Sequence, residues 1–185
     1  MINEVKIIAE VKTESPFGFK SVKIWEELFC IADEIGDIIS VHTNRKWGGS
    51  LDLVERAKKL TSKPILAKGI HPTDRDVIKA HESGADYILV VGRIPEVYNE
   101  KCIIEPLRLE ELYKIPDNSK VLWNTRNLHN GKPKYETFEQ AREIWKGWLC
   151  QASYIRTIKD MKLGADAVLV GSYLNEFYAS LKGLK

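Results

Sequence analysis

The sequence predicts an α/β fold, a (β/α)8 barrel, because eight short apolar segments alternate with amphipathic segments from end to end. An internal repeat supports this: residues 83–90 (SGADYILV) recur as residues 163–170 (LGADAVLV), with corresponding glycines 80 residues apart. Four strand and helix units separate the copies, as two related half-barrels would require. The alternative is that Gly-Ala-Asp before a strand only stops a helix and turns the chain.

The apolar segments have the length of strands, and five of them are followed by apolar residues at helical spacing. We predict strands at residues 5–12, 37–42, 64–68, 86–92, 101–105, 120–124, 148–152 and 166–171. We predict helices, several of them opened by a Ser or Thr cap, at residues 21–35, 51–60, 73–83, 137–146 and 157–163.

The size of the chain predicts one domain, residues 1–185, since 185 residues with 44% apolar content can build a sizeable core. The length is small for a barrel, whose usual range starts near about 200 residues. Residues 94–100 are too few for a real helix, so the barrel must be trimmed. We therefore expect a trimmed (β/α)8 TIM barrel with shortened helices after strands four and five.

Charge and cysteine content limit the partners and the compartment. The net charge of +2 comes without the concentrated basic stripe that binds phosphate backbones, so we expect no nucleic acid partner. No apolar run approaches the roughly 18 residues that span a bilayer, so we expect no membrane partner. Cys30, Cys102 and Cys150 lie far apart in apolar surroundings, which predicts reduced core positions in a cytoplasmic protein.

The first strand ends in two opposite charges, which is the first sign of a functional site. Glu10 and Lys12 are two residues apart, so their side chains point to the same face of the strand. Burying two charges on a core-facing strand is unfavourable unless they are paired or line a wet cavity. The pattern therefore predicts a site at this strand end.

Further polar residues finish other predicted strands. Lys68 ends the third strand and Glu105 the fifth. Asn124 ends the sixth strand, with Arg126 just beyond it. One such residue is usually the solvated start of a loop, but in a barrel the C-terminal strand ends meet at one rim. Together they predict a rim suited to an anionic substrate and to proton transfer.

Two loops with small residues suggest a phosphate site. Ser15 and Gly18 follow the first strand, and Gly171 and Ser172 follow the eighth, where barrels often bind phosphate. The alternative is that these residues only turn the chain and cap a helix. The four histidines show no ligand spacing, so no metal site is predicted.

These residues, in this order, resemble the indole-3-glycerol phosphate synthase family. The first-strand motif is IAEVK followed by Ser-Pro, the third-strand motif is PILAK, and the sixth-strand motif is NTRNL. The second strand and its loop match through SVHT and GGS, and the eighth through GADAVLVG. The resemblance covers most of the chain, and the combination of motifs is more specific than any one of them.

The resemblance implies ring closure of 1-(o-carboxyphenylamino)-1-deoxyribulose 5-phosphate, with loss of carbon dioxide and water and without a cofactor. It implies that Lys68 is the general acid and that Lys12 steadies the substrate carboxylate. Glu105 would be the base for dehydration and Glu10 would hold the lysine network. The remaining residues that it assigns to substrate positioning or phosphate binding are Asn124, Arg126, Ser15, Ser153, Gly171 and Ser172.

The chain departs from the family pattern at several positions. Gly69 and Ile70 follow the third-strand lysine in place of aspartate and phenylalanine, and Glu14 stands where a lysine often precedes the first-strand serine. Ala152 replaces a seventh-strand glutamate, and Tyr154 replaces a glycine near the phosphate. Of these, Glu14, Ala152 and Tyr154 lie where substrate specificity would be set.

Two alternatives to the synthase therefore stay open. One is a related phosphosugar-binding barrel with an altered substrate, although phosphoribosylanthranilate isomerase fits poorly because its first-strand cysteine is absent. The other is a non-catalytic protein that binds a phosphorylated metabolite or serves as a partner subunit. We also expect the barrel to lack the family's N-terminal extension, since the first strand begins near residue 5, and to be a monomer or homodimer.

Overall fold

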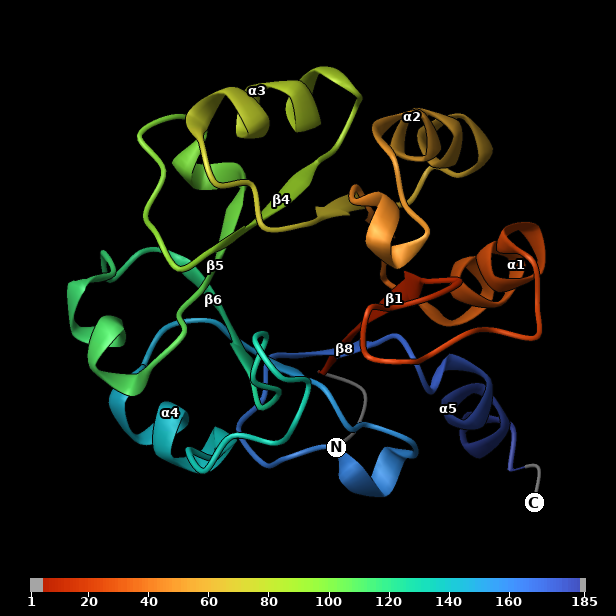
Figure 1. The fold of residues 1–185 in the computed structure, drawn as a ribbon. Coiled ribbons are helices and arrows are strands. Elements are labelled where there is room, and N and C mark those ends of the chain that lie inside the picture. Colours follow the sequence, from red (N-terminus) through yellow and green to blue (C-terminus); the bar gives the residue numbers. More distant parts are fainter. Residues whose placement is uncertain (1–4, 184–185) are drawn as a thin grey trace.

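The computed structural model describes residues 5–183, in which eight parallel strands close into a barrel in chain order (Figure 1). β8 pairs with β1 and so completes the ring. The strands are β1 Lys6–Val11, β2 Ile38–His42, β3 Ile65–Lys68, β4 Tyr87–Val91, β5 Cys102–Glu105, β6 Lys120–Asn124, β7 Leu149–Ala152 and β8 Ala167–Val170. The predicted (β/α)8 fold is confirmed, and each predicted strand end lies within one residue of the observed end.

Helices surround most of the barrel. They are α1 Trp25–Ile35, α2 Leu51–Leu60, α3 Asp74–Glu82, α4 Phe138–Ile144 and α5 Leu174–Leu181. α2 has the predicted bounds, and the predicted threonine caps open α3 and α4 through capping boxes. α1 begins later than predicted, because the Ser21 amide donates to the Thr13 carbonyl and closes the loop after β1. α5 was not predicted.

The prediction of a helix over residues 157–163 was wrong. This segment forms only a 3-10 turn, η5 Ile158–Asp160. The Gln151 side chain explains the difference: its amide donates to the Asp160 carbonyl and its oxygen accepts from the Lys162 amide. These bonds occupy the backbone groups that a longer helix would need.

The outer layer of helices is incomplete beside β4 and β5. Only 3-10 turns follow β4 and β5, namely η3 Asn99–Lys101 and η4 Leu109–Lys114, which confirms the expected shortening there. Figure 1 shows the gap in the helix ring on that side. The structure therefore keeps all eight strands while dispensing with part of the outer layer.

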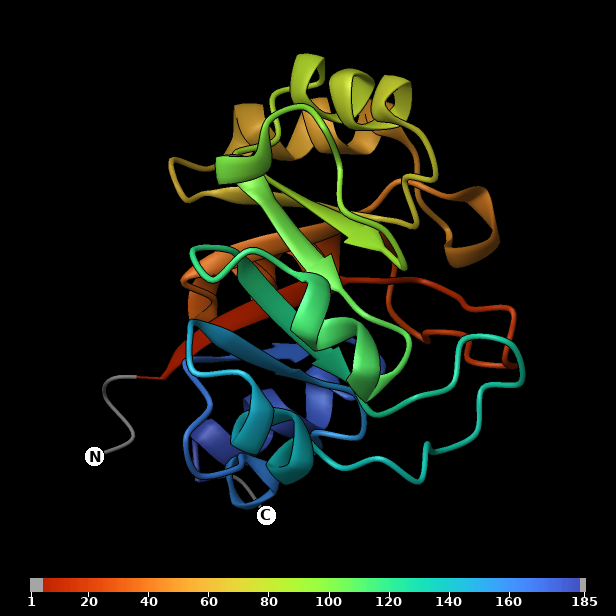
Figure 2. The same cartoon turned by 90° about the vertical axis from the view of Figure 1, so that its left-hand side faces the viewer.

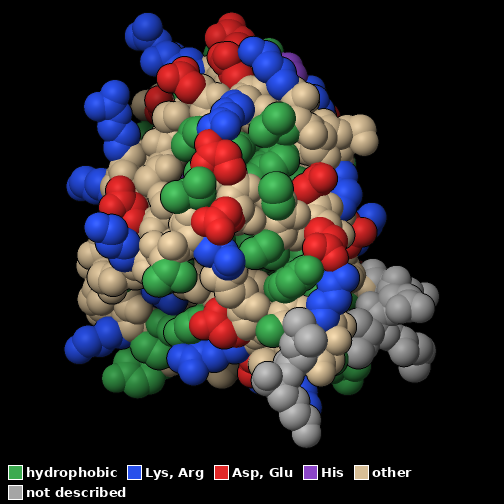
Figure 3. All heavy atoms as spheres, turned by 90° about the vertical axis from the view of Figure 1, so that its right-hand side faces the viewer, with side chains coloured by type: hydrophobic (Ala, Val, Ile, Leu, Met, Phe, Trp, Pro, Cys, Tyr) green, Lys and Arg blue, Asp and Glu red, His purple; other side chains and the backbone are tan. Residues whose placement is uncertain are grey.

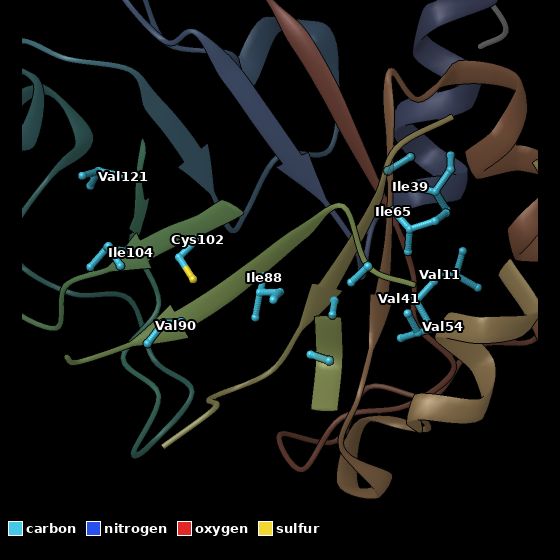
Figure 4. Packing of buried hydrophobic residues seen from close by; sticks show 14 of the residues in the cluster. Val11, Ile39, Val41, Val54, Ile65, Ile88, Val90, Cys102, Ile104 and Val121 are labelled. Carbon is cyan, nitrogen blue, oxygen red and sulfur yellow. The ribbon is translucent and has the colours of Figure 1, made fainter. Parts of the chain in front are cut away.

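The core has two layers because strand side chains alternate between the faces of the sheet. Outward residues such as Val41, Ile65 and Ile88 pack beneath the helices, with Val54 of α2 among them (Figure 4). Inward residues fill the barrel in a separate cluster: Ile8, Ile38, Leu66, Leu89, Ile103, Leu122, Cys150, Ala152, Ala167 and Leu169. The interior is therefore packed below and can hold a site only at its ends.

The internal repeat has a structural role at the bottom of the barrel. Asp86 precedes β4 and accepts a hydrogen bond from the Ile65 amide of β3 at 2.8 Å. Asp166 precedes β8 and does the same for Leu149 of β7, also at 2.8 Å. Each carboxylate also pairs with a basic side chain from a preceding helix. The copies lie four units apart, and their glycines also turn the chain, with φ of 94° and 82°.

Replacing Asp86 with alanine will destabilise the fold by about 1–3 kcal/mol, because the buried Ile65 amide loses its only side-chain acceptor. Asp166→Ala will have an effect of similar size, since its contacts are equivalent. Urea unfolding measures both. Glu55→Ala, on the exposed side of α2, is the control. If Asp86→Ala unfolds at the same urea concentration as this control, the assigned role is wrong.

The surface carries both signs of charge. On the face that includes α1, acidic and basic side chains are interspersed (Figure 3), and Glu26 pairs with Arg56 of α2 at 2.6 Å.

Cys102 and Cys150 are buried as predicted, but Cys30 is exposed because it lies on the solvent side of α1. Within residues 5–183, no helix has both the length and the apolar character needed to cross a membrane.

Candidate active site

A polar layer closes the C-terminal end of the packed barrel interior. On β1 the inward side chains change from Ile8 to Glu10, and on β3 from Leu66 to Lys68. β5 and β6 add the buried side chains of Glu105 and Asn124, and Gly171 directly follows β8. Polar side chains at the ends of β1, β3, β5 and β6 thus cover the apolar core with a charged floor, as the strand-end pattern predicted.

Glu10 holds both lysines of this layer. Its Oε1 lies 3.0 Å from the Nζ of Lys68, and its Oε2 lies 3.4 Å from the Nζ of Lys12. Glu10 is only 1% exposed. Gly171 makes this packing possible, because a Cβ at that position would lie 1.9 Å from Glu10 Oε2. Its hydrogen side chain therefore allows the carboxylate to lie between the two ammonium groups.

The paired charges determine how these groups titrate. Burial alone would raise the pKa of Glu10, but the ammonium groups of Lys12 and Lys68 outweigh it and lower this pKa to about 2. Burial lowers the pKa of Lys12 to about 8, against the attraction of Glu10. At neutral pH Glu10 is therefore a carboxylate, and Lys12 can gain or lose a proton near physiological pH.

Asn124 organises the opposite side of the layer. Its Nδ2 donates to Glu105 Oε1 at 2.9 Å, while its Oδ1 accepts from Ser153 Oγ at 2.7 Å and from the Arg126 amide at 2.9 Å. Burial raises the pKa of Glu105. The carboxyl group of Glu105 lies behind Asn124 and does not line the cavity itself. A buried acid with a raised pKa suits proton transfer.

The cavity above this layer has walls of mixed character. Nine of the ten predicted site residues line it, all except Glu105: Glu10, Lys12, Ser15, Lys68, Asn124, Arg126, Ser153, Gly171 and Ser172. Ser15 Oγ is occupied locally, accepting from the Phe17 amide at 3.3 Å. Glu14 is exposed and lies outside the cavity lining, so its substitution does not reshape the wall directly.

Sequence reasoning missed part of the cavity wall. Phe17 and Leu128, which it did not assign to the site, line the cavity together with Trp47, Arg126 and Tyr154. The Phe17 and Trp47 rings meet edge to face, with centroids 6.4 Å apart. The available signal was an apolar residue inside an otherwise polar loop, as at Phe17 and Leu128. That signal is weak, because an apolar residue in a loop does not indicate which other loop its side chain will contact.

Two of the four histidines are buried. His42 stacks on Trp47 with centroids 4.8 Å apart, and burial lowers its pKa to about 3. His71 Nδ1 bonds the Leu89 carbonyl at 2.6 Å, and burial lowers its pKa. Both rings are therefore neutral at pH 7, and neither adds charge to the site.

No family model matches the chain. The indole-3-glycerol phosphate synthase of Sulfurisphaera tokodaii is 31% identical over 197 residues, which cover 94% of this chain and 79% of that protein. The chain belongs to the indole-3-glycerol phosphate synthase family. The member from Nautilia profundicola is 26% identical, with 92% of this chain and 75% of that protein covered.

A solved structure shows how widely the fold is shared. The crystal structure of a 3-hexulose-6-phosphate synthase matches with a TM-score of 0.65 and 16% identity, covering 95% of this chain and 99% of that one. At this identity the likeness supports the barrel and says nothing about the reaction. Membership of the indole-3-glycerol phosphate synthase family therefore rests on sequence.

Proposed function

We propose that this protein is an indole-3-glycerol phosphate synthase, a carboxy-lyase that closes the indole ring in tryptophan biosynthesis. The observation that carries the proposal is the Glu10 carboxylate held between Lys12 and Lys68 at the floor of one cavity. Two ammonium groups at the floor of a cavity favour the binding of an anionic phosphosugar. The buried carboxyl group of Glu105, directly behind Asn124 of the facing wall, supplies a second proton-handling group.

Each step has a candidate group in this chain. Lys68 Nζ protonates the ribulose carbonyl oxygen as the aromatic carbon attacks the carbonyl carbon, which forms the new carbon–carbon bond. Lys12 holds the substrate carboxylate until carbon dioxide leaves and the ring regains its aromatic electrons. In the loss of water, Glu105 takes a proton from the substrate and Lys12 gives a proton to the leaving hydroxyl group. Asn124 covers Glu105, so the Asn124 side chain must turn before the Glu105 carboxylate reaches the substrate.

The direct test is turnover of 1-(o-carboxyphenylamino)-1-deoxyribulose 5-phosphate by the purified protein, followed through the fluorescence of the indole product. We expect product to accumulate without added metal or cofactor. Correctly folded protein that forms no product under these conditions would contradict the proposal. The Asn124→Ala variant should retain its fold and lose most turnover, since both Glu105 and Arg126 are oriented through Asn124.

The pH profile should report Lys12. An ammonium group binds a carboxylate only while it is protonated, and burial brings the pKa of Lys12 to about 8. We therefore expect kcat/KM to fall as pH rises through about 8, by roughly tenfold per unit. Lys12→Arg should move this fall to higher pH, because arginine stays protonated. If kcat/KM of Lys12→Arg falls at the same pH as that of the wild type, the fall reports another group.

A second candidate function is a phosphosugar-binding barrel with a different substrate, and Ala152 is the observation that favours it. Its methyl group lines the cavity where the family carries a glutamate, so one acid is missing from the wall. Ala152→Glu separates the two candidates. A gain in synthase turnover would indicate a weakened synthase, whereas a loss would indicate that the space beside Ala152 belongs to another ligand.

A further inference from the structure

Tyr154 adopts a backbone conformation that is unfavourable for its residue type. It follows Ser153 at the end of β7, and the two have φ of 59° and 74°. Residues with a Cβ rarely adopt positive φ, and two in succession persist only where the surrounding contacts compensate. The contacts of the Tyr154 side chain therefore need an explanation.

The side chain of Tyr154 makes two contacts with the loop after β6. Its hydroxyl donates to the Gly131 carbonyl at 3.0 Å, and its ring centre lies 4.8 Å from the guanidinium carbon of Arg126. The Phe17 ring lies 5.9 Å from the same carbon. Among residues 5–183, no carboxylate pairs with Arg126. Aromatic faces therefore hold this guanidinium in place of a carboxylate.

The loop after β6 is a hairpin, residues 125–134, whose tip is held by neighbouring loops. The Lys134 amide donates to the Thr125 carbonyl at 2.7 Å and closes the hairpin base. At the tip, a Cβ on Gly131 would lie 2.6 Å from Phe17, so the two loops are in close contact. Figure 2 shows the loops after β1 and β6 extending together past the C-terminal strand ends.

We propose that Tyr154 is a positioning residue that fastens the 125–134 hairpin over the cavity and orients the Arg126 guanidinium toward the anionic group of the substrate. This inference rests on the proposed function for the identity of the substrate. The two contacts have different roles. The Tyr154 hydroxyl fastens the hairpin through its hydrogen bond to Gly131, and the Tyr154 ring stacks on the Arg126 guanidinium. Since the planar guanidinium binds oxyanions through its edge, stacking on its face leaves that edge available.

Two variants separate these contributions. Tyr154→Phe removes only the hydroxyl, while Tyr154→Gly removes the ring and also relieves the positive φ, so it should remain folded. Tyr135→Phe is the matched control, because Tyr135 lies just beyond the hairpin and is fully exposed.

The first measurement does not depend on activity. In Tyr154→Phe we expect the hairpin amides of Asn127, Gly131 and Lys134 to exchange hydrogen for deuterium about tenfold faster, because the fastening bond to Gly131 is lost. The exchange rates of the α2 amides in Tyr154→Phe should not change, nor should those of the hairpin amides in the Tyr135→Phe control. Unchanged exchange in Tyr154→Phe overturns the fastening role.

The second measurement tests Arg126. With the carboxyphenylamino substrate, Tyr154→Gly should raise KM about tenfold and leave kcat within about twofold, because a mobile Arg126 weakens binding without touching the proton donor. Tyr154→Phe should restore most of the lost affinity, as it keeps the ring. Equal KM in wild type and Tyr154→Gly overturns the positioning role.

The two proposals can fail separately. If the wild-type protein forms no product, labelling with phenylglyoxal replaces KM as the readout, and Arg126 in Tyr154→Gly should then react several times faster than in the wild type. Faster labelling supports the positioning of Arg126 while the synthase proposal fails. Equal labelling overturns the positioning role, whatever the substrate is.

Discussion

Replacing Lys68 with alanine will reduce turnover of the carboxyphenylamino substrate by about 10²–10⁴-fold, which is the usual contribution of a positioned general acid. Lys68 Nζ lies at the cavity floor, 3.0 Å from the Glu10 carboxylate that orients it. KM should change much less than kcat, because the proton is transferred in the transition state. Steady-state kinetics with the purified variant will measure both constants.

Controls must separate loss of the proton from loss of the fold. Lys59→Ala removes an exposed lysine at the end of α2 and should leave turnover unchanged. Lys68→Arg keeps a positive charge but not a suitable proton donor, so it should remain folded and stay nearly inactive. Turnover by Lys68→Ala at the wild-type rate would remove Lys68 from the proposed mechanism.

Replacing Glu10 with glutamine will destabilise the protein by about 3–5 kcal/mol, because it leaves two neighbouring ammonium groups without their buried carboxylate. For a chain of this size the melting temperature should fall by roughly 6–20 °C. Thermal unfolding at pH 7 measures the change. Glu14→Gln, an exposed glutamate in the next loop, should melt like the wild type. A Glu10→Gln variant that melts with this control would contradict the assigned pairing.

Acid titration provides an independent check on Glu10. The lysines lower its folded pKa to about 2, below the ordinary value of 4.5. A depressed folded pKa contributes stability above the unfolded value, and that stability is lost as pH falls through the folded one. The difference in stability between wild type and Glu10→Gln should therefore be full above pH 4.5 and shrink between pH 4.5 and about 2.

Much of the fold could be predicted, because local patterns determine strands. Short apolar runs such as residues 37–42 located every strand to within one residue. Helices were harder to predict. Residues 157–163 have helical spacing, but bonds from the Gln151 side chain of β7 occupy their backbone groups. No pattern within the segment itself indicates a bond from another element.

The charged floor of the site was also largely predictable. The two-residue spacing of Glu10 and Lys12 placed both on one face, and barrel topology brought Lys68 beside them. The contacts between the loops of the cavity wall were not predictable in this way. Phe17, Gly131 and Tyr154 come from three loops, and their contacts depend on how those loops fold over the rim.

The sequence by itself therefore determined the barrel, the strand-end charges and the family, because alternation along a strand and the closure of the sheet leave those positions little freedom. Only the tertiary structure decided that Asn124 bonds Glu105 and that the Tyr154 hydroxyl meets the Gly131 carbonyl of the hairpin. The physical reason is that a strand side chain inherits its direction from the sheet. A loop side chain takes its direction from contacts between segments that are distant in the sequence.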